Sequence, residues 1–136
     1  MITLKLGQVC VGKRVFKCRR IPHNMSNQRM FWATKAKWTD AWKEEAFASW
    51  SQNRPRTLKL PLQHAKITIF LHCVHLMDYD GAYNCVKPLL DSLKISGGIG
   101  VIVDDSPKYI DLEVKQIKTA HRKDEHVIIQ IESIRN

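Results

Sequence analysis

The stretch HAKITIFLHCVHLMDYDGAYNCVKPLLDSLKI, residues 64–95, contains the two patterns that decide the fold. Its first part, His64–His75, alternates apolar and polar side chains, which predicts a β-strand with one buried face. Its last part, Asn84–Ile95, has leucines at helical spacing, and Pro88 falls in the first turn, where a helix tolerates a missing N–H group. The residues expected on the buried sides are Ala65, Ile67, Ile69, Leu71 and Cys73 in the strand and Leu89, Leu90 and Leu93 in the helix.

Two further elements are predicted before this stretch. The segment Gln8–Cys18 has the pattern of a basic hairpin that turns at Gly12–Lys13. Aromatic and small side chains then recur at helical spacing, so a helix capped by Thr39 or Asp40 is expected to run to about Asn53. The residues that carry this spacing are Trp42, Ala46, Ser49 and Trp50.

After residue 95 the sequence predicts strands. Val101–Val103 is expected to form a short one. Alternating apolar residues predict two more around Ile110–Val114 and Val127–Ile131. Because the Thr119–Glu125 turn joins these two, they are expected to pair antiparallel to each other.

Length and composition favour one domain with one hydrophobic core, since the 136 residues are 44% hydrophobic. We therefore expect a single domain over residues 1–136, an α/β (α+β) sandwich in which two helices pack on a mixed, largely antiparallel sheet. No apolar run approaches the roughly 18 residues that span a bilayer, and no signal-peptide pattern opens the chain. These observations predict a cytoplasmic protein.

The cysteines show no recognised spacing. Cys10, Cys18, Cys73 and Cys85 form neither a Cys-x-x-Cys pair nor a zinc-ribbon pattern, so they are expected to be reduced, mostly buried thiols. His72 and His75 flank Cys73, but alternation along a strand puts His72 and Cys73 on opposite faces, which argues against a metal site there.

Two pairs of aspartates follow predicted strands. Asp78 and Asp80 come after the strand His64–His75, and Asp104–Asp105 come after Val101–Val103. If these strand ends are neighbours in a sheet, four carboxylates converge and need a cation to offset their repulsion. Mg²⁺ is such a cation, and it takes one or two carboxylates besides water and phosphate. The alternatives are that the aspartates are ordinary turn and cap residues, and that Lys87 is a solvated helix lysine.

The stretch LMDYDGAYNCVKPLLDSLKISGGIGVIVDDSPKYID, from Leu76 to Asp111, resembles the core motif of the RusA family of Holliday junction resolvases, which is common in phages and prophages. The family pattern is an apolar strand, Asp-x-Asp-Asn, a short gap, Lys-x-x-x-Asp-x-Leu, a glycine-containing turn, and an apolar run that closes on Asp-Asp. The matching residues are Asp78, Asp80, Lys87, Asp91, Leu93, Asp104 and Asp105. IPHNMSNQ, residues 21–28, resembles the family's loop after its first strand.

The resemblance implies a Mg²⁺-dependent endodeoxyribonuclease, with Mn²⁺ as an alternative ion, that resolves four-way junctions and other branched DNA by paired nicks. It also implies a homodimer, because two opposed strands must be cut. The implied metal ligands are Asp78, Asp80 and Asp105, with Asp104 as a fourth candidate. Lys87 is the implied cation beside the scissile phosphate, and Asp91 is expected to be its structural partner.

Gly81 departs from the family pattern, which has asparagine at this position. The gap before the lysine is that of longer family members and contains Asn84, a candidate to replace the missing amide. Because neighbouring groups orient metal ligands, the departure leaves a second interpretation open, a catalytically inactive nucleic-acid-binding protein of the same fold. An EF-hand is excluded, because aligning Gly81 with its glycine puts Leu76 at the first ligand position and Lys87 in place of the closing glutamate.

Positive charge is concentrated in the first half of a chain whose formal net charge is +9. Residues 1–62 contain 13 Lys or Arg against three acidic residues, whereas residues 63–136 contain 9 against 10. A basic surface attracts nucleic acid through its phosphates, and the alternative role of such charge is solubility. The expected DNA-binding residues are Arg20, Arg29, Phe31, Lys35 and Lys37.

The segment Arg20–Lys37, which contains all five of these residues, lacks clean periodicity and is expected to be a loop. Its aromatic pair, Phe31 and Trp32, would either stack on unpaired bases or anchor the loop to the core.

Overall fold

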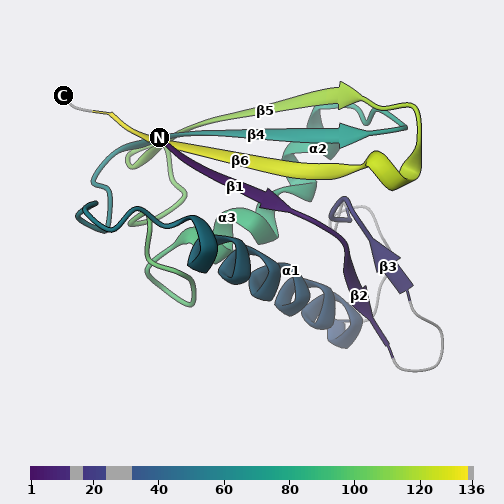
Figure 1. Cartoon of the computed structure of the whole chain (residues 1–136), viewed down its shortest axis with the longest axis horizontal. Helices are drawn as coiled ribbons and strands as arrows, with labels where there is room; N and C mark the ends of the chain where they lie inside the picture. The colour runs from purple at the N-terminus through teal and green to yellow at the C-terminus, as the bar shows by residue number, and fades with distance from the viewer. Residues whose placement is uncertain (13–16, 24–31, 135–136) are drawn as a thin grey trace.

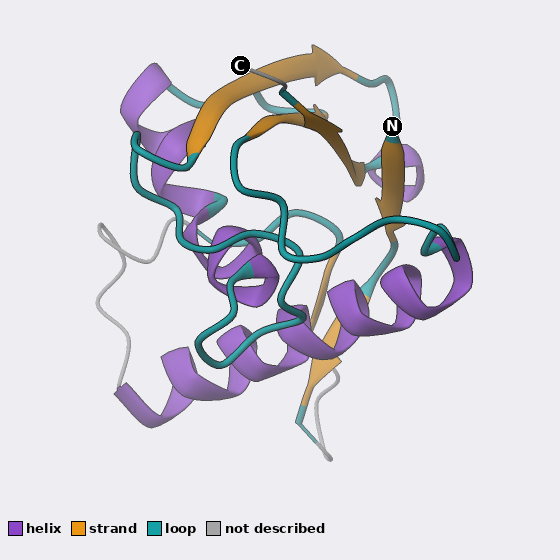
Figure 2. Ribbon diagram, turned by 90° about the vertical axis from the view of Figure 1, so that its left-hand side faces the viewer, coloured by secondary structure: helices purple, strands orange, loops and turns teal. Residues whose placement is uncertain are grey.

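The computed structural model, which describes residues 1–12, 17–23 and 32–134, has a four-stranded sheet with helices packed on one face (Figure 1). Figure 2 shows the same layers from the side, with the long helix α1 running beneath the curved sheet. The elements in chain order are β1 (Ile2–Leu6), β2 (Val9–Val11), β3 (Lys17–Arg19), α1 (Trp32–Asn53), β4 (Ala65–Cys73), α2 (Tyr79–Cys85), α3 (Lys87–Leu93), β5 (Ile110–Lys118), the 3₁₀ helix η1 (Arg122–Asp124) and β6 (His126–Ser133).

The main sheet has the strand order β1-β6-β4-β5, and the hairpin β2–β3 forms a separate two-stranded sheet. β1 pairs antiparallel with β6, β6 pairs antiparallel with β4, and β4 pairs parallel with β5. This arrangement confirms the mixed, largely antiparallel α+β fold. β1 is an element that we did not predict, although Ile2, Leu4 and Leu6 alternate and are buried.

The expected pairing of β5 with β6 is wrong, because β4 lies between them. Alternation in each strand shows which face is buried but does not specify the neighbouring strand. β4 is buried at every second residue, as expected, and it takes both other strands as partners. Its parallel partner β5 requires a long crossover, which the segment 74–109 supplies.

Helix α1 begins earlier than expected, at Trp32 rather than at Thr39 or Asp40. Trp38 is buried four residues before Trp42 and so extends the apolar stripe by one turn toward the N-terminus. The remaining buried residues of α1 are Trp42, Ala46, Ser49 and Trp50, as predicted. The expectation of a loop through Lys37 is therefore wrong for residues 32–37, which are helical, whereas residues 24–31 lie outside the described residues.

The predicted helix over Asn84–Ile95 is two helices, α2 and α3, that meet at Val86. Pro88 lies in the first turn of α3, where its missing N–H group costs little, so the chain restarts a helix there instead of continuing α2. Leu89, Leu90 and Leu93 are buried as expected.

Val101–Val103 is not a strand of the main sheet. Ile102 makes isolated parallel bridges to Leu62 and Lys94, so this segment crosses between two other loops. No helix among the described residues is long and apolar enough to cross a membrane.

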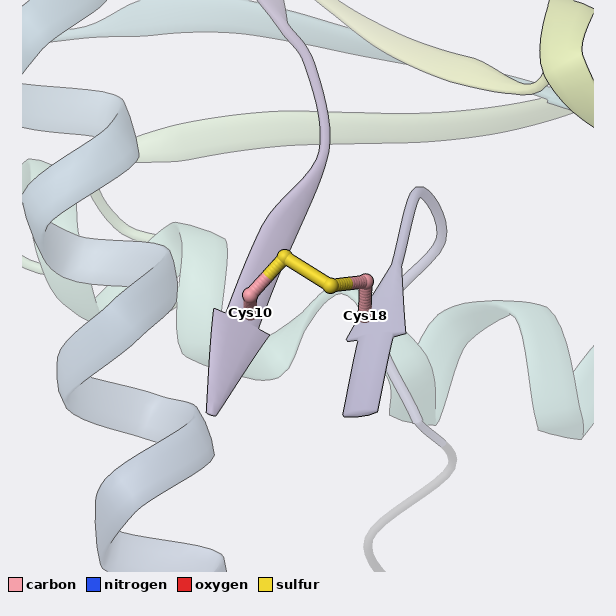
Figure 3. Close-up of a disulfide and its surroundings, with 2 residues drawn as sticks. All are labelled: Cys10 and Cys18. Atoms are coloured by element: carbon pink, nitrogen blue, oxygen red, sulfur yellow. A yellow bond between two sulfur atoms is a disulfide. The ribbon is translucent and has the colours of Figure 1, made fainter. Parts of the chain in front are cut away.

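The prediction of four reduced cysteines is wrong for two of them. Cys10 on β2 lies opposite Cys18 on β3, and their sulfur atoms form a disulfide (Figure 3). The register of the hairpin places the two cysteines opposite each other. Their separation of eight residues in the sequence does not by itself indicate that register, so the disulfide was not predicted. Cys73 and Cys85 are free and buried, as expected.

We predict that reduction of the Cys10–Cys18 disulfide lowers the free energy of unfolding by about 2–3 kcal/mol, because a closed loop of this length restricts the unfolded chain. Urea denaturation with and without dithiothreitol measures the change, and the Cys10→Ser variant should be insensitive to the reductant. Four titratable thiols in the air-exposed, unreduced protein under denaturing conditions would contradict the disulfide.

Candidate functional site

Three carboxylates meet at the ammonium group of Lys94, the residue after α3. Lys94 Nζ lies 2.9 Å from Asp91 Oδ1, 3.2 Å from Asp105 Oδ1 and 3.6 Å from Asp104 Oδ1. Lys87 Nζ contacts the same group through Asp105 Oδ2 and through Asp91 Oδ1 at 3.4 Å. We call these five residues the acid–lysine cluster.

Helical spacing and a tight loop build this cluster. Lys87, Asp91 and Lys94 are separated by four and three residues, so they lie on one face of α3 and its C-terminal end. The chain then turns back, and the Val101 and Ile102 N–H groups both donate to the Leu93 carbonyl, at 2.9 and 3.1 Å. This return delivers Asp104 and Asp105 to the two lysines.

The lysines hold the carboxylate of Asp105 in its charged form. The side chain of Asp105 is 16% exposed, and burial by itself raises its pKa, but hydrogen bonds from Lys87 and Lys94 outweigh burial and lower the pKa to about 2. In turn, the pKa of Lys94 is raised to about 12. The hydrogen bond to Asp91 is the largest cause, burial acts in the opposite direction, and the hydrogen bond to Asp105 raises the pKa further. The hydrogen bond to Asp105 likewise raises the pKa of Lys87.

Gly98 allows the loop to close against the end of α3. A Cβ atom at this position would lie 2.5 Å from the Ser92 carbonyl oxygen, 2.6 Å from that of Lys94 and 2.8 Å from that of Asp91. All three are backbone atoms, so they have little room to move. The close approach therefore requires glycine.

We predict that Gly98→Ala lowers the free energy of unfolding by about 1–3 kcal/mol, because the added methyl group forces the backbone apart. Gly7→Ala is the matched control, since its Cβ would meet its nearest neighbour, Glu45 Oε1, at an ordinary 3.8 Å. Chemical denaturation of both variants measures the difference. Equal stabilities would show that the loop does not pack against α3 as described.

The ionised form of Asp105 stabilises the fold, because its pKa of about 2 lies below the ordinary value of 3.8. That stabilisation is fully present above pH about 4 and is lost as the pH falls toward about 2. We therefore predict that stability falls more steeply with acidification in the wild-type protein than in Asp105→Asn. Urea titrations across this pH range test the difference, and Glu132→Gln, an exposed change on β6, should keep the wild-type slope.

Asp78 and Asp80 lie at the start of α2, away from this cluster in the chain. Asp78 is the N-cap of α2, and its Oδ1 accepts a 2.7 Å hydrogen bond from the Gly81 N–H group. Gln116 on β5 fixes the preceding residue, because its side-chain amide makes hydrogen bonds of 2.7 and 2.9 Å with the Met77 backbone. Asp80 is exposed in the first turn of α2.

The two acidic pairs are therefore not at neighbouring strand ends. Asp78 follows the end of β4, whereas Asp104–Asp105 precede the start of β5, and these two points lie at opposite ends of a parallel strand pair. Within the described residues, no three His, Cys, Asp or Glu side chains are grouped so as to hold a metal ion. The donor chemistry nevertheless fits Mg²⁺, because carboxylate oxygens are its preferred protein ligands and one or two suffice.

The expected DNA-binding residues lie on different elements, and two of them lie outside the described residues. Lys35 and Lys37 lie in the first two turns of α1, three and five residues after Trp32, which is 81% exposed. Arg20 lies after β3 and lines a cavity. Arg29 and Phe31 lie outside the described residues.

Sequence reasoning missed Lys94, whose ammonium group pairs with all three carboxylates of the acid–lysine cluster. Its signal was present, because Lys94 is three residues after Asp91 and shares its helical face. It also missed Arg19, Arg122 and Lys123, which line the cavity with Arg20 and come from distant parts of the chain. Only the fold brings those residues together.

Comparisons of this chain with protein-family models, with curated proteins and with solved structures found no match.

Proposed function

We propose that this chain is a Mg²⁺-dependent, structure-selective endodeoxyribonuclease that resolves four-way junctions and other branched DNA by paired nicks. The observation that carries the proposal is the contact of Lys87 with Asp105, 18 residues later in the sequence. The lysine and the closing acidic pair of the motif are thus side by side. The resemblance to the RusA family supplies the substrate class.

Each residue has a role in this proposal. Lys87, whose pKa is raised, stays protonated at neutral pH and would stabilise negative charge on the scissile phosphate. Asp91 holds the Lys87 side chain in place from one turn further along α3. Asp78, Asp80 and Asp105 stay the proposed metal ligands, with Asp104 as a fourth, although the described residues do not group three of them at one point; one or two of these carboxylates suffice for Mg²⁺. Bound Mg²⁺ would supply Lewis-acid activation of water and phosphate.

Paired nicks require two active sites, so the proposal includes a homodimer. An isologous interface would relate two copies of the site by a two-fold axis. β5 is an edge strand of the main sheet, whereas β4 is paired on both sides. The edge of β5, which α2 covers at Val114 where its N–H group donates to Tyr83 Oη, is the proposed dimer surface within the described part of the chain.

The proposed substrate makes the cytoplasm the proposed place of action. That compartment is reducing, so Cys10 and Cys18 would be thiols there, and the hairpin would depend on its backbone hydrogen bonds and its packing against α1.

The second candidate is a DNA-binding protein of the same fold without catalytic activity. Two observations favour it. Lys87 and Lys94 already offset the carboxylates of Asp91, Asp104 and Asp105 without a metal ion. Gly81 is buried and lacks the side-chain amide that the family pattern has at this position.

We predict that Asp80→Asn abolishes Mg²⁺-dependent cleavage of a four-way junction and leaves junction binding intact or tighter, because it removes a proposed ligand and a negative charge near DNA. Asp80 suits this test because it is exposed and makes no ion pair among the described residues, so the fold should be unaffected.

Gel analysis of cleavage with Mg²⁺ and with EDTA measures activity, and Glu132→Gln, an equal change of charge on β6, should cleave normally. A wild-type protein that binds junctions in EDTA yet never cuts them with Mg²⁺ or Mn²⁺ would favour the non-catalytic candidate. Full cleavage by Asp80→Asn would show that the site lies elsewhere.

A further inference from the structure

A cavity of about 520 Å³ lies between the hairpin β2–β3, the C-terminal end of β4 and the turn that contains η1. Among the described residues, four cationic side chains line it: Arg19, Arg20, Arg122 and Lys123. Its size falls in the range of about 300–1,000 Å³ that is typical of small-molecule sites, so it exceeds the needs of a single small ion.

The cavity has a large excess of positive charge. Its one lining carboxylate is Glu125, and Oε2 of that side chain already accepts a 2.9 Å hydrogen bond from the Val74 N–H group. Among the described residues, none of the four cations lies within 4.0 Å of a carboxylate oxygen. The remaining segments, 13–16, 24–31 and 135–136, contain no Asp or Glu.

Within the described part of the chain, Arg19 is held in place without a carboxylate within 4.0 Å of its guanidinium group. Its Nε–H group donates a 3.0 Å hydrogen bond to the Ile21 carbonyl, which fixes the plane of the guanidinium group, and its two terminal nitrogens carry four further N–H groups. Burial lowers the pKa of Arg19, and the charge of Glu125 only partly offsets that effect. A bound anion with several acceptor oxygens would offset the free-energy cost of burying the Arg19 charge. Phosphate suits this role, because its oxygens match the planar guanidinium fork.

The cavity also adjoins one of the proposed metal ligands, Asp78. Met77 lines it, and the next residue is Asp78, the cap of α2. Ile21, Pro22 and Met77 add apolar surface beside the cations. A DNA strand with one phosphate among the cations would pass Asp78 where it leaves the cavity on the Met77 side.

We propose that this cavity binds one nucleotide unit of a DNA strand, with its phosphate on Arg19, Arg20, Arg122 and Lys123 and its sugar or base against the apolar wall. The inference rests on the proposed function, because it assigns the strand that the nuclease would cut to this cavity. Arg19, Arg122 and Lys123 then join Arg20 as DNA-binding residues.

The first test compares Arg122→Gln/Lys123→Gln with the matched pair Arg56→Gln/Lys59→Gln, two exposed cations in the loop after α1. Binding of a labelled four-way junction is measured in EDTA at several salt concentrations. Loss of the cavity's one phosphate contact should reduce the steepness of log affinity against log salt by about 0.9, which is about eightfold in affinity at 0.1 M salt. The control pair should keep the wild-type slope.

A second variant covers the opposite wall of the cavity. Arg20→Gln lies after β3 rather than on η1, so it tests the same site even if the change in η1 affects the turn. It should reduce the steepness by a similar amount. Wild-type slopes for both Arg20→Gln and the η1 pair would overturn the proposal.

The third arm identifies the source of the phosphate. Inorganic phosphate, a deoxynucleoside monophosphate and a short single-stranded oligonucleotide are titrated separately by calorimetry into wild-type protein and the η1 variant. Of the three ligands, the oligonucleotide should bind the wild-type protein most tightly. At low oligonucleotide concentration, the η1 variant should show no binding. Inorganic phosphate that binds as tightly as the oligonucleotide would identify a free-anion site and overturn the assignment to DNA.

The outcomes separate this inference from the proposed function. A protein that binds DNA through the cavity and never cleaves it would refute the nuclease and keep the inference. Cleavage with unchanged binding by all cavity variants would refute the inference alone. A wild-type protein that binds neither DNA nor mononucleotide would refute both.

Discussion

The parallel pairing of β4 with β5 is the constraint on which the position of every candidate site residue depends. Parallel neighbours start at the same end of a sheet, so the chain must return along the whole length of β4 before β5 can begin. The segment 74–109 makes this return and contains α2, α3 and the loop closed at Gly98. Both acidic pairs and both lysines of the acid–lysine cluster lie in it. The same segment therefore completes the sheet and carries the chemistry.

The acid–lysine cluster shows how opposite charges on a crossover fix its geometry. Three carboxylates at such short range repel one another unless cations lie among them, and Lys87 and Lys94 occupy that place. Ion pairs with a solvent-exposed partner, such as the pair of Lys87 with Asp91, contribute little to stability individually. Their main effect is on position, because Lys94 joins the end of α3 to the loop that precedes β5. Lys87, more exposed than Lys94, keeps its charge toward solvent.

Local patterns predicted the elements whose buried faces follow a simple period, among them β4 and most of α1. They did not predict the neighbours of each strand, because burial of one face is compatible with several strand pairings. The Cys10–Cys18 disulfide and the position of β5 in the sheet both depend on strand pairing, so neither was predicted. Within the candidate site, the contact of Lys87 with Asp91 follows from helical spacing alone. The separation of Asp78 from Asp105 did not follow from the sequence, because the expected strand at Val101–Val103 is a loop bridge.

The cavity beside Met77 has walls from four parts of the sequence, at Gln8 and around residues 18–22, 73–77 and 122–125. In an unfolded chain these walls do not exist as a unit, so a ligand that requires all of them can bind only the folded state. Its occupancy then enters the folding equilibrium by mass action, and each tenfold excess of ligand over its dissociation constant adds about 1.4 kcal/mol to the free energy of unfolding. An occupied cavity would thus act as a reversible crosslink that ties the hairpin, the end of β4 and the turn before β6 into one cooperative unit.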